Sequence, residues 1–102
     1  MGQFVKVARV SEVAPGEARL VEIEGRRIAL FNLNGTFHAI DDVCPHRGGP
    51  LSEGTLEGEI VVCPWHGARF RISTGEVLSP PATHGVTCYP VRVQGEDIEI
   101  EV

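Results

Sequence analysis

Apolar and polar residues alternate over much of the N-terminal half of this chain. Residues 5–8 and 20–24 alternate in this way, and the second stretch ends at a turn marked by Gly25. Residues 27–33 form an almost continuous apolar run. A period of two is typical of a β-strand with one buried face. We therefore expect strands in all three segments.

The dipeptide Asn34-Gly35 follows the apolar run directly. Asn-Gly is the strongest short-range signal for a two-residue type I′ turn, because both of its residues tolerate a positive φ. Residues 36–40 then return as a second apolar stretch. The sequence predicts a tight β-hairpin centred on Asn34 and Gly35.

The C-terminal residues repeat the period of two. A strand is predicted at residues 86–93, with Tyr89, Val91 and Val93 on one face. After a turn at Gly95, aliphatic and acidic residues alternate through Ile98, Glu99, Ile100, Glu101 and Val102. We expect the aliphatic side chains in the core and the carboxylates in water. The acidic residues of this stretch are predicted to form a solvated strand edge.

Short strands separated by Gly/Pro turns favour an all-β domain, either an antiparallel sandwich or a small barrel. A single helical turn is expected at residues 11–14. At 102 residues the chain is predicted to be one domain, residues 1–102. Residues 41–85 break the alternation and hold five of the seven prolines. We expect stiff loops outside any sheet there.

Composition narrows the classes of partner and compartment. The formal net charge is −5, which argues against nucleic acid as a partner. The apolar runs are too short to span a bilayer, and the N-terminus lacks the apolar core of a signal peptide. The sequence predicts a cytoplasmic protein that does not enter a membrane.

Two short pairs of residues carry the chemistry. They are Cys44-Pro45-His46 and Cys63-Pro64-Trp65-His66, and they use four of the seven Cys and His residues of the chain. Each pair offers one thiolate and one imidazole from a tight loop. A mixed Cys₂His₂ set is typical of a Rieske-type [2Fe–2S] centre, in which two His replace two Cys on one iron. The predicted metal and cofactor ligands are Cys44, His46, Cys63 and His66.

Two other interpretations of these pairs remain open. Structural zinc prefers C-x₂₋₄-C and H-x₃₋₅-H pairs, which the C-x-H spacing matches poorly, but ligand types alone do not fix the metal. The pairs are also compatible with buried cysteines and surface histidines that bind nothing. Cys88 has no His partner nearby, and we expect it to pack in the core or within a strand.

At these residues the chain resembles the Rieske family, and in particular its soluble Rieske-type ferredoxins. The matching motif is Cys44-Pro45-His46-Arg47-Gly48-Gly49 with Cys63-Pro64-Trp65-His66-Gly67. The resemblance also covers residues 51–54, residues 70–75 and Pro80-Pro81, and so extends over essentially the whole chain. It implies stacked antiparallel β-sheets with a cluster-binding subdomain at one end, at approximately residues 41–85. It also implies a third loop, at Pro80-Pro81, over the cluster.

Departures from the respiratory and photosynthetic Rieske proteins affect the expected potential. Those proteins carry a loop-tying disulfide, and the corresponding positions here are Gly49 and Trp65. They also place hydroxyl groups near the sulfurs, where this chain has Ala68 and Phe70. Fewer donors stabilise the reduced cluster less. We expect a potential at the lower end of the Rieske range.

The resemblance implies a one-electron carrier rather than a stand-alone enzyme. It would pass electrons from a flavin reductase to a terminal dioxygenase that acts on aromatic rings. Docking is expected near both ligand histidines, His46 and His66, at a tip formed by Pro45, Trp65, Pro80 and Pro81. A monomer suits such a shuttle. The alternative is the small Rieske-like subunit of an NAD(P)H nitrite reductase.

Overall fold

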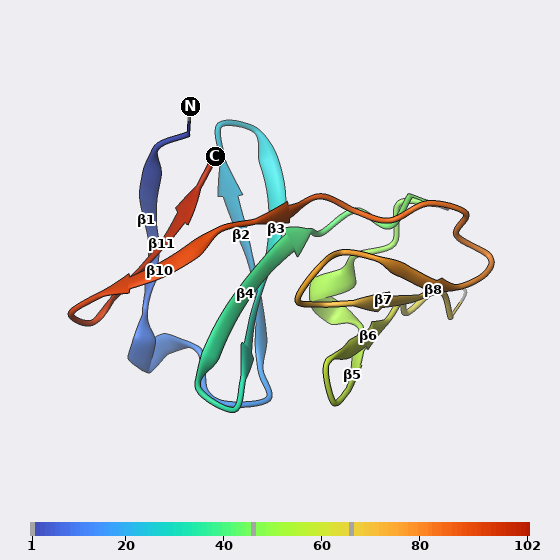
Figure 1. The fold of residues 1–102 in the computed structure, drawn as a ribbon, viewed down its shortest axis with the longest axis horizontal. Helices are drawn as coiled ribbons and strands as arrows, with labels where there is room; N and C mark the ends of the chain where they lie inside the picture. The colour runs from blue at the N-terminus through green and yellow to red at the C-terminus, as the bar shows by residue number, and fades with distance from the viewer. Residues whose placement is uncertain (1, 46, 66) are drawn as a thin grey trace.

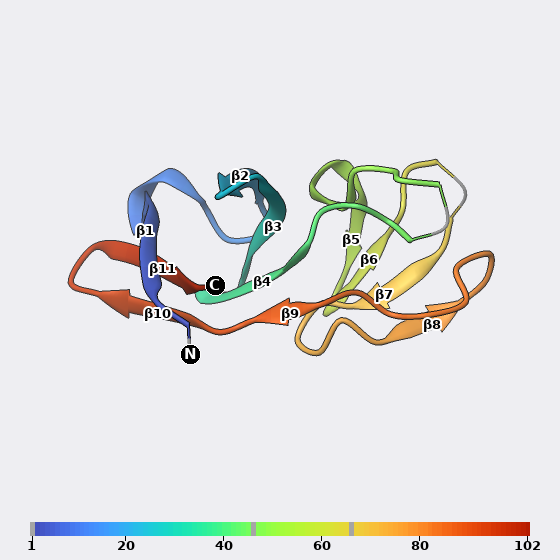
Figure 2. The same ribbon diagram turned by 90° about the horizontal axis from the view of Figure 1, so that it is seen from above.

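The computed structural model describes residues 2–45, 47–65 and 67–102. Three antiparallel sheets follow one another along the long axis of the molecule (Figure 1). The terminal sheet has the order β1-β11-β10, the central sheet β2-β3-β4-β9, and the small sheet β5-β6-β7-β8. The terminal and small sheets occupy opposite ends in both views (Figures 1 and 2). The predicted all-β class is confirmed.

The strands are short, and four pairs of successive strands are joined by two-residue turns. The terminal sheet contains β1 (Phe4–Arg9), β10 (Val91–Gln94) and β11 (Asp97–Glu101). The central sheet contains β2 (Ala18–Ile23), β3 (Arg26–Leu33), β4 (Thr36–Asp41) and β9 (Cys88–Tyr89). The small sheet contains β5 (Thr55–Glu57), β6 (Ile60–Val62), β7 (Arg69–Arg71) and β8 (Val77–Ser79).

The hairpin predicted at Asn34-Gly35 is present. Leu33 pairs with Thr36, and the two residues between them have φ values of 54° and 92°. Positive φ at both central positions is the requirement of a type I′ turn. The Asn32 side chain supports the turn, because its Oδ1 accepts a hydrogen bond of 2.7 Å from the N–H of Gly35.

Residues 28–31 of strand β3 are all apolar because both faces of the central sheet are covered there. Ile28 and Leu30 belong to the buried group between the central and terminal sheets. Ala29 and Phe31 belong to a second buried group, which lies between the central sheet and the loops and strands of the small sheet. Successive residues of a strand point to opposite faces, so an unbroken apolar run fits a strand buried on both sides.

The prediction that residues 41–85 form no sheet is wrong. This segment contains all four strands of the small sheet. Each of these strands has only three residues, which is too short to show an alternating pattern in the sequence. Val61 and Phe70, which are directly paired, are fully buried in the second group.

The strand predicted at residues 86–93 is divided. Pro90 separates β9 in the central sheet from β10 in the terminal sheet. Tyr89 is buried, whereas the side chain of Val93 is 45% exposed. A proline cannot donate to a ladder, which explains the break between the two sheets.

The acidic residues near the C-terminus do not form a sheet edge, so that prediction is also wrong. Strand β11 is the middle strand of the terminal sheet. Two of its acidic residues, and Glu96 before it, pair with basic residues: Lys6 with Asp97 at 3.2 Å, Arg9 with Glu96 at 2.8 Å, and Arg92 with Glu99 at 2.6 Å. The carboxylates thus balance cations within the sheet.

Helical structure is limited to two 3₁₀ turns, η1 (Val10–Glu12) and η2 (Leu51–Glu53), within the described residues. The first overlaps the helical turn expected at residues 11–14. No helix among the described ranges has the length and apolar character needed to cross a bilayer.

Candidate metal centre

Two hairpin loops of the same length and construction carry the Cys/His pairs. In the first, the N–H of Cys44 donates to the carbonyl of Gly49 at 2.9 Å, and the N–H of Gly48 donates to the carbonyl of Cys44 at 2.7 Å. In the second, Cys63 N–H donates to the Ala68 carbonyl at 2.8 Å, and Gly67 N–H donates to the Cys63 carbonyl at 3.1 Å. Loops 44–49 and 63–68 are therefore closed by the same two bonds.

The equivalence extends to the stems and to the backbone conformation. An isolated bridge joins Val43 to Pro50 below the first loop, and Val62 pairs with Arg69 below the second. The fifth residues of the loops, Gly48 and Gly67, have φ values of 81° and 79°. The histidine is the third residue of the first loop and the fourth of the second. Two loops closed by the same hydrogen bonds thus carry Cys/His pairs whose spacing in the sequence differs by one residue.

The two cysteines come together in the structure. Cys44 is 2% exposed and Cys63 is 3% exposed, and both belong to the second buried group. A carbon added at the Cα of Gly49 would lie 2.7 Å from the Sγ of Cys63 and 3.1 Å from Cγ of Trp65. Only glycine allows so close an approach, so the backbone of the first loop rests directly on the thiol of the second.

His46 and His66 lie outside the described residues. Of the four predicted ligands, the structure brings Cys44 and Cys63 into one buried group. Two buried thiols open matched loops, and in the sequence a histidine follows two residues after Cys44 and three residues after Cys63. This set of residues fits the donors of a mixed Cys/His cluster.

The third predicted loop also reaches this group. Ala82, one residue after Pro80-Pro81, is 6% exposed and packs in the same buried group as the cysteines. Pro80 is exposed and Pro81 is half-buried. Trp65, in the second loop, is 56% exposed, and Val43, in the stem of the first, is 43% exposed. Large apolar side chains therefore remain open to solvent next to the cysteines.

Two adjacent carboxylates at the end of β4 were not predicted from the sequence. Asp41 accepts a hydrogen bond from the Tyr89 hydroxyl at 2.7 Å and another from Thr87 N–H at 3.2 Å. Asp42 is fully buried and accepts a bond of 2.7 Å from Ser52 N–H. The sequence signal was a pair of acidic residues, separated from the first cysteine loop by Val43.

Burial and the neighbouring Asp41 carboxylate both raise the pKa of Tyr89. Loss of water around the hydroxyl disfavours the phenolate, and the hydrogen bond to Asp41 stabilises the protonated form. Tyr89 therefore acts as a neutral donor that ties β9 to the end of β4.

Cys88 was expected in the core or within a strand; it lies within a strand but not in the core. This residue is exposed on β9, and its thiol lies 3.4 Å from the carbonyl of Ser73. Partial burial of the sulfur raises the pKa of the Cys88 thiol, which favours the unreactive protonated form. The apolar neighbours in the sequence predicted a strand correctly but not which face the thiol takes.

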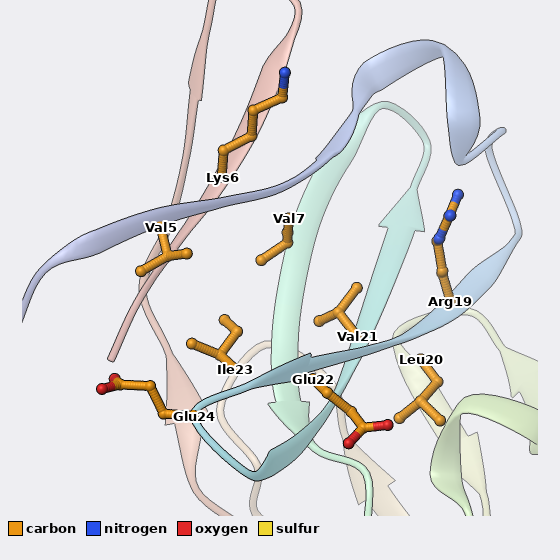
Figure 3. Close-up of a pocket in the computed structure, with 9 residues that line it drawn as sticks. All are labelled: Val5, Lys6, Val7, Arg19, Leu20, Val21, Glu22, Ile23 and Glu24. Carbon is orange, nitrogen blue, oxygen red and sulfur yellow. The ribbon is translucent and has the colours of Figure 1, made fainter.

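An open pocket of about 470 Å³ lies away from these loops, between β1 and β2 (Figure 3). Val5, Val7, Val21 and Ile23 point into it, whereas the charged side chains of Lys6 and Glu22 point away. The pocket is the gap between the edges of the terminal and central sheets, and it contributes nothing to the cysteine loops.

The model of the Rieske [2Fe-2S] domain family matches residues 3–90, which include both loops. The chain belongs to this family. Its cofactor is therefore a [2Fe–2S] cluster, and the resemblance seen in the sequence is confirmed.

Relatives of this Rieske protein are named as parts of dioxygenase systems. The biphenyl dioxygenase ferredoxin subunit of Pseudomonas sp. (strain KKS102) is 40% identical over 99 residues, covering 96% of this chain and 91% of that protein. The 3-phenylpropionate/cinnamic acid dioxygenase ferredoxin subunit of Shigella boydii serotype 4 (strain Sb227) is 46% identical over 94 residues, covering 91% and 88%.

Solved structures include both kinds of protein considered from the sequence. A chain in the complex of reduced oxygenase and oxidised ferredoxin in carbazole 1,9a-dioxygenase has a TM-score of 0.90 and 34% identity, covering 95% of this chain and 91% of that chain. A protein from Mycobacterium tuberculosis that is described as an NADH-dependent nitrite reductase small subunit has a TM-score of 0.90 and 26% identity, covering 100% of this chain and 96% of that chain. The fold alone therefore does not separate the two functions.

Proposed function

We propose that Cys44 and Cys63 bind one iron of the cluster and that His46 and His66 bind the other. The burial of both cysteines in one group supports this assignment, as does the matched construction of their loops. Two thiolates balance the charge of a core with two ferric irons and two sulfides. Neutral imidazoles then leave the site neutral, so an added electron is accepted more easily than by a four-thiolate cluster.

The bound cluster supplies one-electron redox chemistry. The chain's own contribution is to hold and shield it. The backbone at Gly49 covers the Cys63 thiol, and the fully buried Leu51, Phe70 and Ile72 exclude water from the same group. Residues 1–102 would act as one Rieske domain, with residues 41–85 as its approximate cluster-binding subdomain.

The chain then serves as the ferredoxin component of a ring-hydroxylating dioxygenase system. It carries electrons from a flavin reductase to the terminal oxygenase and does not act as a stand-alone enzyme. The observation that carries this proposal is the similarity to ferredoxin subunits of such systems. Two of them are 40% and 46% identical to this chain over nearly its whole length. The solved complex of an oxygenase with its ferredoxin supports the same kind of partner. A monomer in the cytoplasm suits this shuttle.

Docking to the reductase and the oxygenase takes place at the tip that carries His46, His66 and Trp65. Pro45, Pro80 and Pro81 complete this tip. The exposure of Trp65 beside a buried thiol supports this location, because exposed aromatic residues are frequent anchors of binding sites. Redox encounters of this kind use small, transient interfaces.

The potential is expected near the lower end of the Rieske range, at about −150 mV. Ala68 and Phe70 are fully buried close to the cysteines and have no hydroxyl group to donate to sulfur. Protein-film voltammetry measures the midpoint directly. A value near the upper end of the range, about +300 mV, would contradict this expectation.

A transfer assay separates the ferredoxin from the nitrite reductase subunit. The reduced protein is mixed anaerobically with an oxidised terminal oxygenase of the biphenyl type or with the sirohaem subunit of a nitrite reductase, and its visible spectrum is followed by stopped flow. We expect rapid reoxidation by the oxygenase only. Selective reoxidation by the sirohaem subunit, or stable association with it, would overturn the proposal.

A further inference from the structure

Asp42 joins both sides of the stem below the first cysteine loop. Its backbone carbonyl accepts a hydrogen bond of 2.7 Å from Leu51 N–H. Its side-chain Oδ1 accepts a second bond of 2.7 Å, from Ser52 N–H. The stem has one further bridge, between Val43 and Pro50. The Asp42 carboxylate therefore reinforces a stem that has little ladder of its own.

The second carboxylate oxygen is placed differently. Asp42 Oδ2 is buried and has no hydrogen-bond partner among the described residues. It faces the Nη2 of Arg27 at 3.7 Å, and the Arg27 side chain is 49% exposed while that of Asp42 is 0% exposed. The anion is thus enclosed, and its cation stands at the surface.

A buried carboxylate with one unbonded oxygen is unfavourable for folding. An asparagine at this position would retain an oxygen for the Ser52 N–H without burying a charge. The stem bond alone therefore does not require an aspartate. The charge itself, enclosed beside the first loop, needs a separate role.

We propose that Asp42 is a positioning residue for the first cluster loop and that its buried negative charge lowers the reduction potential of the cluster. The inference rests on the ligand set proposed for Cys44 and its partners. Asp42 is two residues before Cys44, so their Cα atoms are at most about 7 Å apart. A fixed negative charge on a residue so near a proposed ligand in the chain, poorly screened by water, opposes the arrival of an electron.

The test compares Asp42→Asn with Glu53→Gln in the cluster-loaded protein. Both substitutions remove one negative charge, but Glu53 is exposed on η2, one residue after the Ser52 N–H that Asp42 binds. Midpoint potentials are measured by voltammetry at low and high salt, together with iron and sulfide content. Asp42→Asn should raise the potential at both salt concentrations, and Glu53→Gln should cause a smaller shift that high salt removes.

An Asp42→Asn protein with a full cluster and an unchanged potential would overturn the inference, as would a shift that salt removes. If Asp42→Asn fails to hold a cluster, Arg27→Gln provides the test. The Arg27 side chain is half-exposed, so replacing it does not leave a cavity in the core. Loss of this cation leaves the buried carboxylate uncompensated and should lower the potential at high salt as well as at low salt. An unchanged or higher potential, or a shift that high salt removes, contradicts the inference. A wild-type protein without a cluster would instead refute the proposed function.

Discussion

Gly49 shows how a single residue can fix the relation of the two cysteine loops. Its backbone rests on the Cys63 thiol and on the ring of Trp65, with no room for a side chain. The sequence motif contains both Gly48 and Gly49. It did not distinguish Gly49, whose requirement is space, from Gly48, whose requirement is a positive φ of 81°.

Gly49→Ala should therefore reduce cluster content. The added carbon would lie 2.7 Å from the Sγ of Cys63, so the loop or the thiol must move. Iron and sulfide per chain, with the visible spectrum, measure the loss. Gly58→Ala on the β5–β6 turn is the comparison: no atom lies within 4 Å of its added carbon, and its φ of 63° means that it reports the cost of backbone strain without a clash. Equal cluster content in the Gly49→Ala and wild-type proteins would contradict the packing described here.

Tyr89 provides a second prediction at this scale. Its raised pKa stabilises the folded state fully below the ordinary tyrosine value of 10.0, and this contribution is lost as the pH rises through the folded pKa. Tyr89→Phe removes the bond to Asp41 and should lower the free energy of unfolding by about 1 kcal/mol near neutral pH.

The difference between wild type and Tyr89→Phe should shrink at strongly alkaline pH. Urea denaturation at a series of pH values measures it, with Phe37→Leu, a half-buried residue on β4, as a variant that has no titrating group at the altered position. A difference that stays constant across the alkaline range would show that the Tyr89 hydroxyl does not titrate as described.

At the scale of elements, the sequence predicted those strands whose pattern is long enough to read. Strands β2, β3, β4 and β11 each have at least five residues, and all were expected. The small sheet was missed because its strands have three residues each, and their partners are set by tertiary packing. Pro90 and the exposed face of Cys88 were misjudged because sequence alone does not say which sheet a short strand joins.

The type I′ turn at Asn34-Gly35 gives the prediction for this scale. Gly35→Ala should lower the free energy of unfolding by about 1–2 kcal/mol, because φ is 92° and an L-residue is strained there. No atom lies within 4 Å of the added carbon, so the effect is confined to the backbone. Thermal or urea denaturation measures it, and the midpoint potential should not change. Wild-type stability in this variant would contradict the assigned turn.

In the whole molecule, the two cysteine loops lie apart from the terminal sheet. It measures 39 Å along its longest axis, with the terminal and small sheets at opposite ends (Figures 1 and 2). The cysteine motif and the resemblance that it carries predicted the family and the cofactor. They gave no indication of Asp42, whose buried charge depends on how β4 packs against η2 and Arg27.

Trp65→Ala should slow electron transfer to the oxygenase by about fivefold or more, the effect of losing more than about 1 kcal/mol at an interface anchor. Val93→Ala is the matched control. Val93 is 45% exposed and Trp65 56%, but Val93 lies on β10 in the terminal sheet, whereas Trp65 lies on the β6–β7 loop of the small sheet. Equal rates for the two variants in stopped-flow transfer would place docking elsewhere.

The ligand set is tested most directly by pulsed EPR of the reduced protein labelled with ¹⁵N-histidine. The chain has four histidines, and His38 and His84 are the two outside the proposed site. We expect couplings from two directly bound nitrogens, unchanged in the His38→Gln and His84→Gln variants. A spectrum with one or no such coupling, or one that changes when His38 or His84 is replaced, would contradict the assignment of Cys44, His46, Cys63 and His66.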